Sequence, residues 1–141
     1  MADVRAQLIV NRAQLQNVLT GPQSAAVQGV SRLQRRVLAT AKMRSPVRHG
    51  VLRNSHVAEP IRVAGMKVST GVSAQANYAM YVHEGTRPHV IRPNTAQVLS
   101  WQGPRGRIFA REVHHPGTRP RPWLRLALNE EAGRLGFTVG Q

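Results

Sequence analysis

The chain opens with helical periodicity. Apolar side chains recur at helical spacing from Ser24 to about Met43, which predicts a long amphipathic helix with Ser24 as its N-cap. The residue before a proline disfavours helical geometry, so this helix is expected to end at Ser45-Pro46. A shorter helix is predicted over residues 11–19, and Gly21-Pro22 separates the two.

Beyond residue 55, apolar and polar residues alternate with the two-residue period of half-buried strands. Alternation on either side of Ala64-Gly65 predicts a hairpin of strands 57–63 and 66–72. Further strands are predicted over 78–82, 98–101 and 108–113. The last two flank the turn Gly103-Pro104-Arg105-Gly106. After Pro122 the period becomes helical again and predicts a short C-terminal helix.

The order helix, strands, helix lacks an alternating strand–helix–strand rhythm, which indicates the α+β class. We expect a single antiparallel sheet of four to five strands, packed by the long N-terminal helix, with a short C-terminal helix. The 141 residues suit a single domain over 1–141, with its core at about 24–135 and a loose tail over 136–141.

Charge narrows the choice of partners. Lys and Arg number 20 against 6 Asp and Glu, a net charge of +14, and all the basic residues except Lys42 and Lys67 are arginines. There is no run of five or six basic residues, so a disordered nucleic-acid-binding tail is not indicated. The excess predicts affinity for a polyanion or for an acidic protein neighbour. Arginine favours bidentate contacts with carboxylate or phosphate.

Several functional classes are disfavoured. The chain has no cysteine, nucleophile elbow, phosphate loop or zinc-protease motif, so neither an enzyme nor a cofactor is expected. His83, His89, His114 and His115 lack the spacing of a zinc site. No apolar stretch approaches the roughly 20 residues of a membrane span, and the first residues lack a signal peptide's apolar run. We expect no membrane partner and a cytosolic chain.

A short motif occurs twice. His83-Glu84-Gly85-Thr86-Arg87-Pro88 is echoed by His115-Pro116-Gly117-Thr118-Arg119-Pro120. Two Gly-Thr-Arg-Pro loops that lie side by side would present Arg87 and Arg119 together. Two chance turns of similar composition are the alternative.

Trp123 has two interpretations. It is either an exposed stacking ring or a core anchor, and its place at the head of a helix favours the core anchor.

Three segments, in order, resemble one family of phage proteins. Residues 45–55, Ser-Pro-Val-Arg-His-Gly-Val-Leu-Arg-Asn-Ser, follow a helix as does that family's Ala-Pro-x-x-Thr-Gly-x-Leu-x-x-Ser loop. Residues 77–86, Asn-Tyr-Ala-Met-Tyr-Val-His-Glu-Gly-Thr, are similar to its Tyr-Ala-x-Tyr-Val-Glu-x-Gly-Thr strand. Residues 120–128, Pro-Arg-Pro-Trp-Leu-Arg-Leu-Ala-Leu, resemble its Pro-x-Pro-Phe-Leu-x-x-Ala-Leu ending. This chain departs from the pattern at Ser45, His49 and Trp123.

The family is the head–tail joining and tail-completion family of long-tailed phages, named for the gene-ten product of lambdoid relatives and akin to minor tail protein Z. The resemblance covers about residues 24–130. It implies a virion protein at the neck of a siphovirus-like particle, where copies form a sixfold or twelvefold ring between the head and the tail. It also implies assembly in the cytoplasm of the host cell. A tail terminator ring is an alternative within the same class. The rival from another class is a basic nucleic-acid-binding protein.

The expected partners are other copies of the chain and connector or tail proteins with acidic surfaces. Contact between the ring and packaged DNA stays open as an addition. The candidate interface residues lie in polar loops and at the head of the last helix: Arg48, His49, Arg53, Arg87, His89, Arg119, Arg121 and Trp123.

Overall fold

The computed structural model describes residues 12–137, which divide into two compact units. Unit 1 contains residues 12–76 and 123–137, and unit 2 contains residues 77–122. The single domain over 1–141 stays a prediction, and residues 138–141 of the predicted tail lie outside the described residues.

The helices of unit 1 begin and end where local chemistry requires it. They are α1 (Arg12–Thr20), α2 (Ala25–Arg44), α3 (Val51–Asn54) and α5 (Trp123–Arg134). The Ser24 hydroxyl accepts a hydrogen bond from the Val27 amide at 3.1 Å, and so satisfies one free donor of the first turn of α2. At the other end Ser45 is extended and its amide donates to the Ala41 carbonyl. The predicted N-cap and the stop before Pro46 are confirmed.

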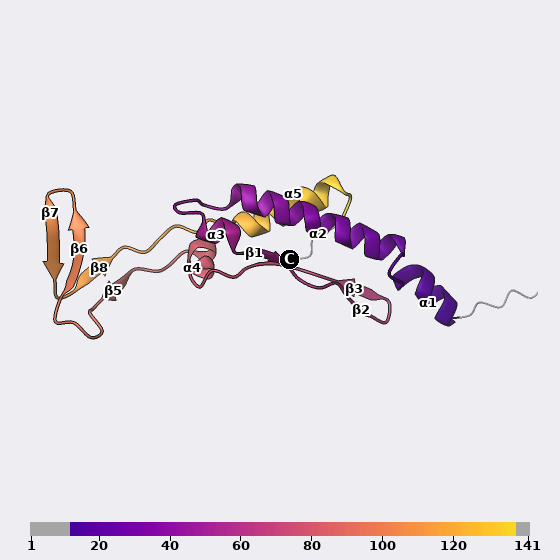
Figure 1. The fold of residues 1–141 in the computed structure, drawn as a ribbon, viewed down its shortest axis with the longest axis horizontal. Helices are drawn as coiled ribbons and strands as arrows, with labels where there is room; N and C mark the ends of the chain where they lie inside the picture. Colours follow the sequence, from indigo (N-terminus) through magenta and orange to yellow (C-terminus); the bar gives the residue numbers. More distant parts are fainter. Residues whose placement is uncertain (1–11, 138–141) are drawn as a thin grey trace, which may run out of the picture. The chain divides into compact units, whose positions relative to one another are not determined.

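The core of unit 1 lies between α2 and α5, which run side by side (Figure 1). Small residues permit this close approach, since Ala41 and Ala127 are both fully buried. Larger side chains close the core around them, and the buried apolar residues of the unit are Val37, Ala41, Leu52, Trp123, Ala127 and Ala132. The predicted C-terminal helix is therefore confirmed as a core element.

Unit 1 also contains four short strands. They are β1 (His56–Ala58), β2 (Arg62–Ala64), β3 (Lys67–Ser69) and β4 (Val72–Ala74). β2 and β3 form the predicted hairpin, whose turn uses Gly65 at a φ of +58°. β1 pairs with β4. The buried Gln34 side chain on α2 donates to the carbonyls of Glu59, at 2.6 Å, and Gly71, at 3.0 Å, and so ties the helix to this ribbon.

Unit 2 consists of a short helix and two ribbons. Its elements are α4 (Ala79–Glu84), β5 (His89–Ile91), β6 (Leu99–Gly103), β7 (Gly106–Ala110) and β8 (Val113–His115). β6 and β7 form an antiparallel hairpin at the predicted Gly103-Pro104-Arg105-Gly106 turn. β5 pairs with β8, whose residues are far from it in sequence.

The expectation of one sheet with four to five strands is wrong. The described residues contain four separate two-stranded antiparallel sheets, β1–β4, β2–β3, β5–β8 and β6–β7. The strands of unit 1 are three residues each. Pro60 interrupts the predicted strand 57–63, because proline has no amide to donate to a ladder, and Gly71 falls in the bend between β3 and β4.

The predicted strand over 78–82 is also wrong, because residues 79–84 form helix α4. Alternating apolar residues over so short a stretch fit one helical turn as well as a strand. Ala79, Met80 and Glu84 are good helix formers, and the Val82 amide donates to the Tyr78 carbonyl at 3.2 Å. Gly85, with a φ of +73°, ends the turn.

Within residues 12–137 no helix has both the length and the apolarity to cross a lipid bilayer.

Candidate interface of the paired Gly-Thr-Arg-Pro loops

The two copies of the repeated motif meet in unit 2 and form a structure that we call the clasp, residues 85–88 and 117–120. Thr86 and Thr118 face each other across an antiparallel bridge. Each amide donates to the other's carbonyl at 3.1 Å, and the two hydroxyls lie 3.1 Å apart. The prediction that these loops lie side by side is confirmed.

Glycine is required at matching positions in both halves of the clasp. Gly85 and Gly117 have φ values of +73° and +86°, a region that side chains rarely adopt. A Cβ at Gly85 would lie 2.5 Å from the Thr118 carbonyl oxygen, and one at Gly117 would overlap the Thr86 carbonyl. Each loop therefore approaches the other's backbone through its own glycine.

The bridge also determines which residues stand next to the two arginines of the motif. Antiparallel pairing of Thr86 with Thr118 sets the backbone of Arg87 opposite Gly117 and that of Arg119 opposite Gly85. Residues in this diagonal relation have Cα atoms about 7–8 Å apart. Both arginines are exposed. The clasp thus places the backbones of two exposed arginines close together, each opposite a residue with no side chain.

A histidine pair continues the clasp into β5 and β8. His89 lies directly opposite His115, and the ring centroids are 5.1 Å apart. The His89 Nδ1 lies 2.9 Å from the Arg87 carbonyl and the His115 Nδ1 accepts from the Gly117 amide at 3.0 Å. Each ring thus fixes the backbone next to one half of the clasp. Among the described residues, no three histidine or acidic side chains gather as a metal site would require.

The glutamates of unit 2 are engaged elsewhere. Glu84 pairs with His83 at 2.6 Å. Glu112 pairs with Arg92 at 3.2 Å and lies 3.5 Å from His114. Within the described part of the chain, no carboxylate pairs with the two clasp arginines, with Arg105, Arg107 and Arg111 near the β6–β7 hairpin, or with Arg121.

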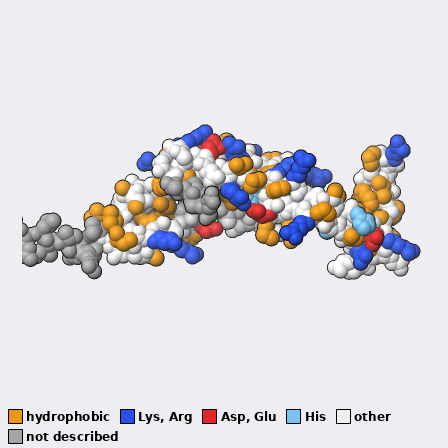
Figure 2. Space-filling view, turned by 180° about the vertical axis from the view of Figure 1, so that it is seen from behind, with side chains coloured by type: hydrophobic (Ala, Val, Ile, Leu, Met, Phe, Trp, Pro, Cys, Tyr) orange, Lys and Arg blue, Asp and Glu red, His pale blue; other side chains and the backbone are white. Residues whose placement is uncertain are grey.

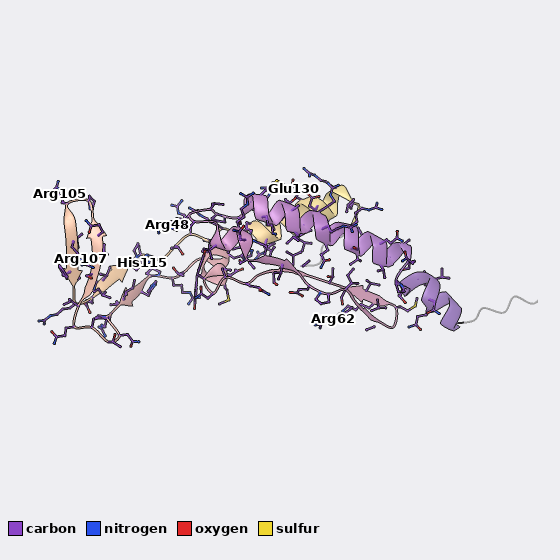
Figure 3. The ribbon with its side chains drawn as sticks, in the orientation of Figure 1. Arg48, Arg62, Arg105, Arg107, His115 and Glu130 are labelled. Carbon is purple, nitrogen blue, oxygen red and sulfur yellow. The ribbon has the colours of Figure 1, made fainter. Side chains whose placement is uncertain are left out.

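The remaining interface candidates are distributed between the units. Arg48, His49 and Arg53 are exposed in the segment that follows α2 in unit 1 (Figure 3 labels Arg48). In unit 2, Arg121 donates its amide to the Val82 carbonyl at 3.0 Å and its side chain is exposed. Of the other candidates, Arg87 and Arg119 lie in the clasp and His89 follows it in β5.

Trp123 lies in the core of unit 1, with 3% of its surface exposed. Its indole Nε1 donates to His56 Nε2 at 2.8 Å, and His56 Nδ1 lies 3.0 Å from the Arg53 carbonyl. The core-anchor interpretation is therefore confirmed, and the ring offers little surface to a partner. The role of His56 was missed from the sequence, because this side chain becomes the acceptor of the Trp123 N–H only when β1 and α5 meet in the fold. It explains why tryptophan serves here, since phenylalanine has no N–H to donate.

A buried carboxylate in unit 1 was also missed. Glu131 is 2% exposed and accepts hydrogen bonds from Arg36 Nε at 2.6 Å and the Thr40 hydroxyl at 2.7 Å. The Arg36 hydrogen bond, followed by that of Thr40, lowers the pKa of Glu131 below its ordinary value of 4.5, against the opposing effect of burial. Beside it, Glu130 (labelled in Figure 3) pairs with Arg44 and Arg134. The ion pairs of Glu130 and Glu131 join α5 to α2, and both carboxylates are therefore paired at that contact.

Comparisons of this chain with protein-family models, with curated proteins and with solved structures find no match.

Proposed function

We propose that this chain is a structural, non-enzymatic protein of the phage neck. Copies would form a ring that joins or completes the junction between the head connector and the tail, and the ring would dock on acidic neighbours. A tail terminator ring is the closest alternative.

The proposal rests on where the three family-like segments fall in the structure. Each segment contributes to the buried apolar set: Leu52 from the first, Ala79 from the second, and Trp123 and Ala127 from the third. Motifs that coincide with buried positions support a shared fold, because such positions tolerate few side chains. The second segment also ends at Thr86, within the clasp.

Charge supports the kind of partner. Every copy carries +14, so a ring of copies concentrates positive charge. The glutamates of α5 are already paired with arginines of α2 and α5, and those of unit 2 are engaged as well. The unpaired, exposed clasp arginines thus favour acidic surfaces on neighbouring proteins. Truncation of one partner in a desolvated arginine–carboxylate pair typically weakens binding by about 2–5 kcal/mol.

The test is Arg119→Ala in the genome of the phage that encodes the chain. We expect infected cells to accumulate heads and tails that do not join, as counted by electron microscopy. Arg62→Ala is the matched control, because Arg62 is an exposed arginine on β2 outside the clasp. Joined virions in normal number from Arg119→Ala would contradict the proposal. A cryo-EM map of the particle neck would also locate the copies directly.

One observation favours nucleic-acid binding as a second candidate. The β6–β7 hairpin exposes the rings of Trp101 and Phe109 beside Arg105 and Arg107, and exposed rings interleaved with basic side chains suit stacking with bases. Phosphate contacts predict that affinity falls with salt at a log–log slope near −0.9 per contact. Failure to bind either single-stranded or duplex DNA at about 50 mM salt would remove this candidate.

A further inference from the structure

The β6–β7 hairpin has one apolar face and one polar face. Its register pairs Leu99 with Ala110 and Trp101 with Ile108 on one face, and ends at Gly103 opposite Gly106. Alternation of side chains puts Ser100, Gln102, Arg107 and Phe109 on the other face. The first face therefore contains no polar side chain.

Nothing in unit 2 pairs with this hairpin along its edges. Trp101 and Ile108 are each 41% exposed, and the described strands include none that is hydrogen-bonded to the outer edge of β6 or β7. Figure 2 shows hydrophobic side chains along the hairpin beneath a basic tip. A two-stranded ribbon with an open apolar face is marginally stable in water, so the face gains from being covered.

The tip of the hairpin adds a charge requirement. Arg105 lies at the turn and Arg107 on β7 just below it (Figure 3), and Arg111 follows the end of β7. Unit 2 has seven arginines and two glutamates, a net +5. The remaining 95 residues carry 13 basic and 4 acidic side chains, a net +9.

These charges argue against a second copy of the chain as the cover, since it would bring the same excess of positive charge. A DNA duplex would satisfy the arginines and leave the Trp101–Ile108 pair unexplained. A protein groove with an apolar floor and an acidic rim satisfies both.

We propose that the β6–β7 hairpin is a docking arm that inserts into such a groove on a different, acidic protein. The Trp101–Ile108 pair covers the floor, and Arg105 and Arg107 pair with carboxylates at the rim. The inference goes beyond the neck assignment, since it concerns one hairpin and applies to any assembly that the chain joins.

The test titrates the full chain into a fluorescein-labelled peptide of alternating leucine and glutamate and follows anisotropy. We expect saturable binding that Trp101→Ser and Ile108→Ser each weaken by about tenfold or more, as for buried anchor residues. Arg105→Gln with Arg107→Gln should weaken it similarly. Phe109→Ser is the matched control, an exposed apolar residue on the opposite face, and should change affinity by less than about twofold. Circular dichroism checks that every variant folds.

Four outcomes would each overturn the proposal. The first is no binding of the leucine–glutamate peptide. The second is equal binding of polyglutamate, which lacks an apolar side. The third is tighter binding of a DNA duplex that Trp101→Ser leaves unchanged. The fourth is a dimer by sedimentation that Trp101→Ser dissociates. Because none of these assays involves a virion, failure here and failure of head–tail joining are separate results.

Discussion

Different interactions stabilise the interior of each of the two units of this protein. Unit 1 packs α2 against α5 around buried side chains and satisfies a buried carboxylate with arginine and threonine. Unit 2 consists of a short helix and two hydrogen-bonded strand pairs, and the clasp lies next to the β5–β8 pair. Among the described residues, Ala79 is the one buried side chain of unit 2. The difference teaches that unit 1 is stabilised by a buried core, whereas unit 2 is stabilised by backbone pairing and leaves nearly all its apolar side chains at least partly exposed.

The largest expected effect comes from Trp123→Ala. Removing this buried ring should lower the free energy of unfolding by about 3–5 kcal/mol, because it leaves a cavity and deprives His56 of its donor. Urea unfolding followed by the helical circular dichroism signal, which arises mostly in unit 1, measures this. The matched control is Trp101→Ala in the exposed hairpin, which should cost no more than about 0.5 kcal/mol. Equal losses from both tryptophans would erase the contrast between the units.

Glu131→Ala is expected to be next in size. It removes the acceptor of Arg36 and Thr40 and should cost about 3 kcal/mol, at the low end for a buried pair because Arg36 is half-exposed. The control is Glu112→Ala in unit 2, whose ion pair with Arg92 is exposed and should contribute less than about 1 kcal/mol. The same urea titration compares the two, and a larger loss at Glu112 would refute the assignment.

Acid should weaken unit 1 through the same carboxylate. The pKa of Glu131 is lower in the folded chain than its ordinary 4.5, so its contribution is complete above that pH and is lost as the pH falls through the lowered pKa. Thermal unfolding between neutral and acid pH should show this fall. The Glu131→Ala variant should show a shallower one, and an unchanged pH dependence in that variant would assign the effect to other groups.

The clasp glycines should show a smaller, local effect. Gly85→Ala or Gly117→Ala forces a side chain into a left-handed backbone and against the opposite loop, at a cost of about 1–3 kcal/mol. Faster hydrogen exchange at the Thr86 and Thr118 amides, with unit 1 unchanged, is the expected result. Gly133→Ala in α5 meets no atom within 4 Å and should instead stabilise the helix by about 1 kcal/mol. Unchanged exchange at the threonines would show that the clasp does not depend on its glycines.

The smallest effect is expected at the clasp arginines. Arg87→Gln removes an unpaired charge near Arg119, so stability should change by less than about 0.5 kcal/mol, with a slight gain at low salt. The contrasting variant is Arg36→Gln, which loses a hydrogen bond to a buried carboxylate and should cost about 1.5–3 kcal/mol. Thermal unfolding of both variants at two salt concentrations measures the difference. A large loss of stability in Arg87→Gln would mean that this arginine supports the fold.

The sequence predicts a structural feature best when the residues that produce it are neighbours in the chain. The N-cap at Ser24, the stop before Pro46, the Gly65 hairpin and the turn at Pro104 each follow from one or two residues, and all are confirmed. The helix over 79–84 was missed because its apolar spacing fits two periods. The side-by-side Gly-Thr-Arg-Pro loops were found because a repeat marks both partners at once.

The sequence by itself determined the α+β class, the long and the C-terminal helices, the excess of arginine and the pair of matching loops. The tertiary structure alone decided that the strands form four ribbons instead of one sheet. It also decided that His56 accepts from Trp123 and that Glu131 lies between Arg36 and Thr40. The physical reason is range: caps and turns depend on neighbours in the chain, whereas strand partners and buried hydrogen bonds join residues whose separation no local pattern records.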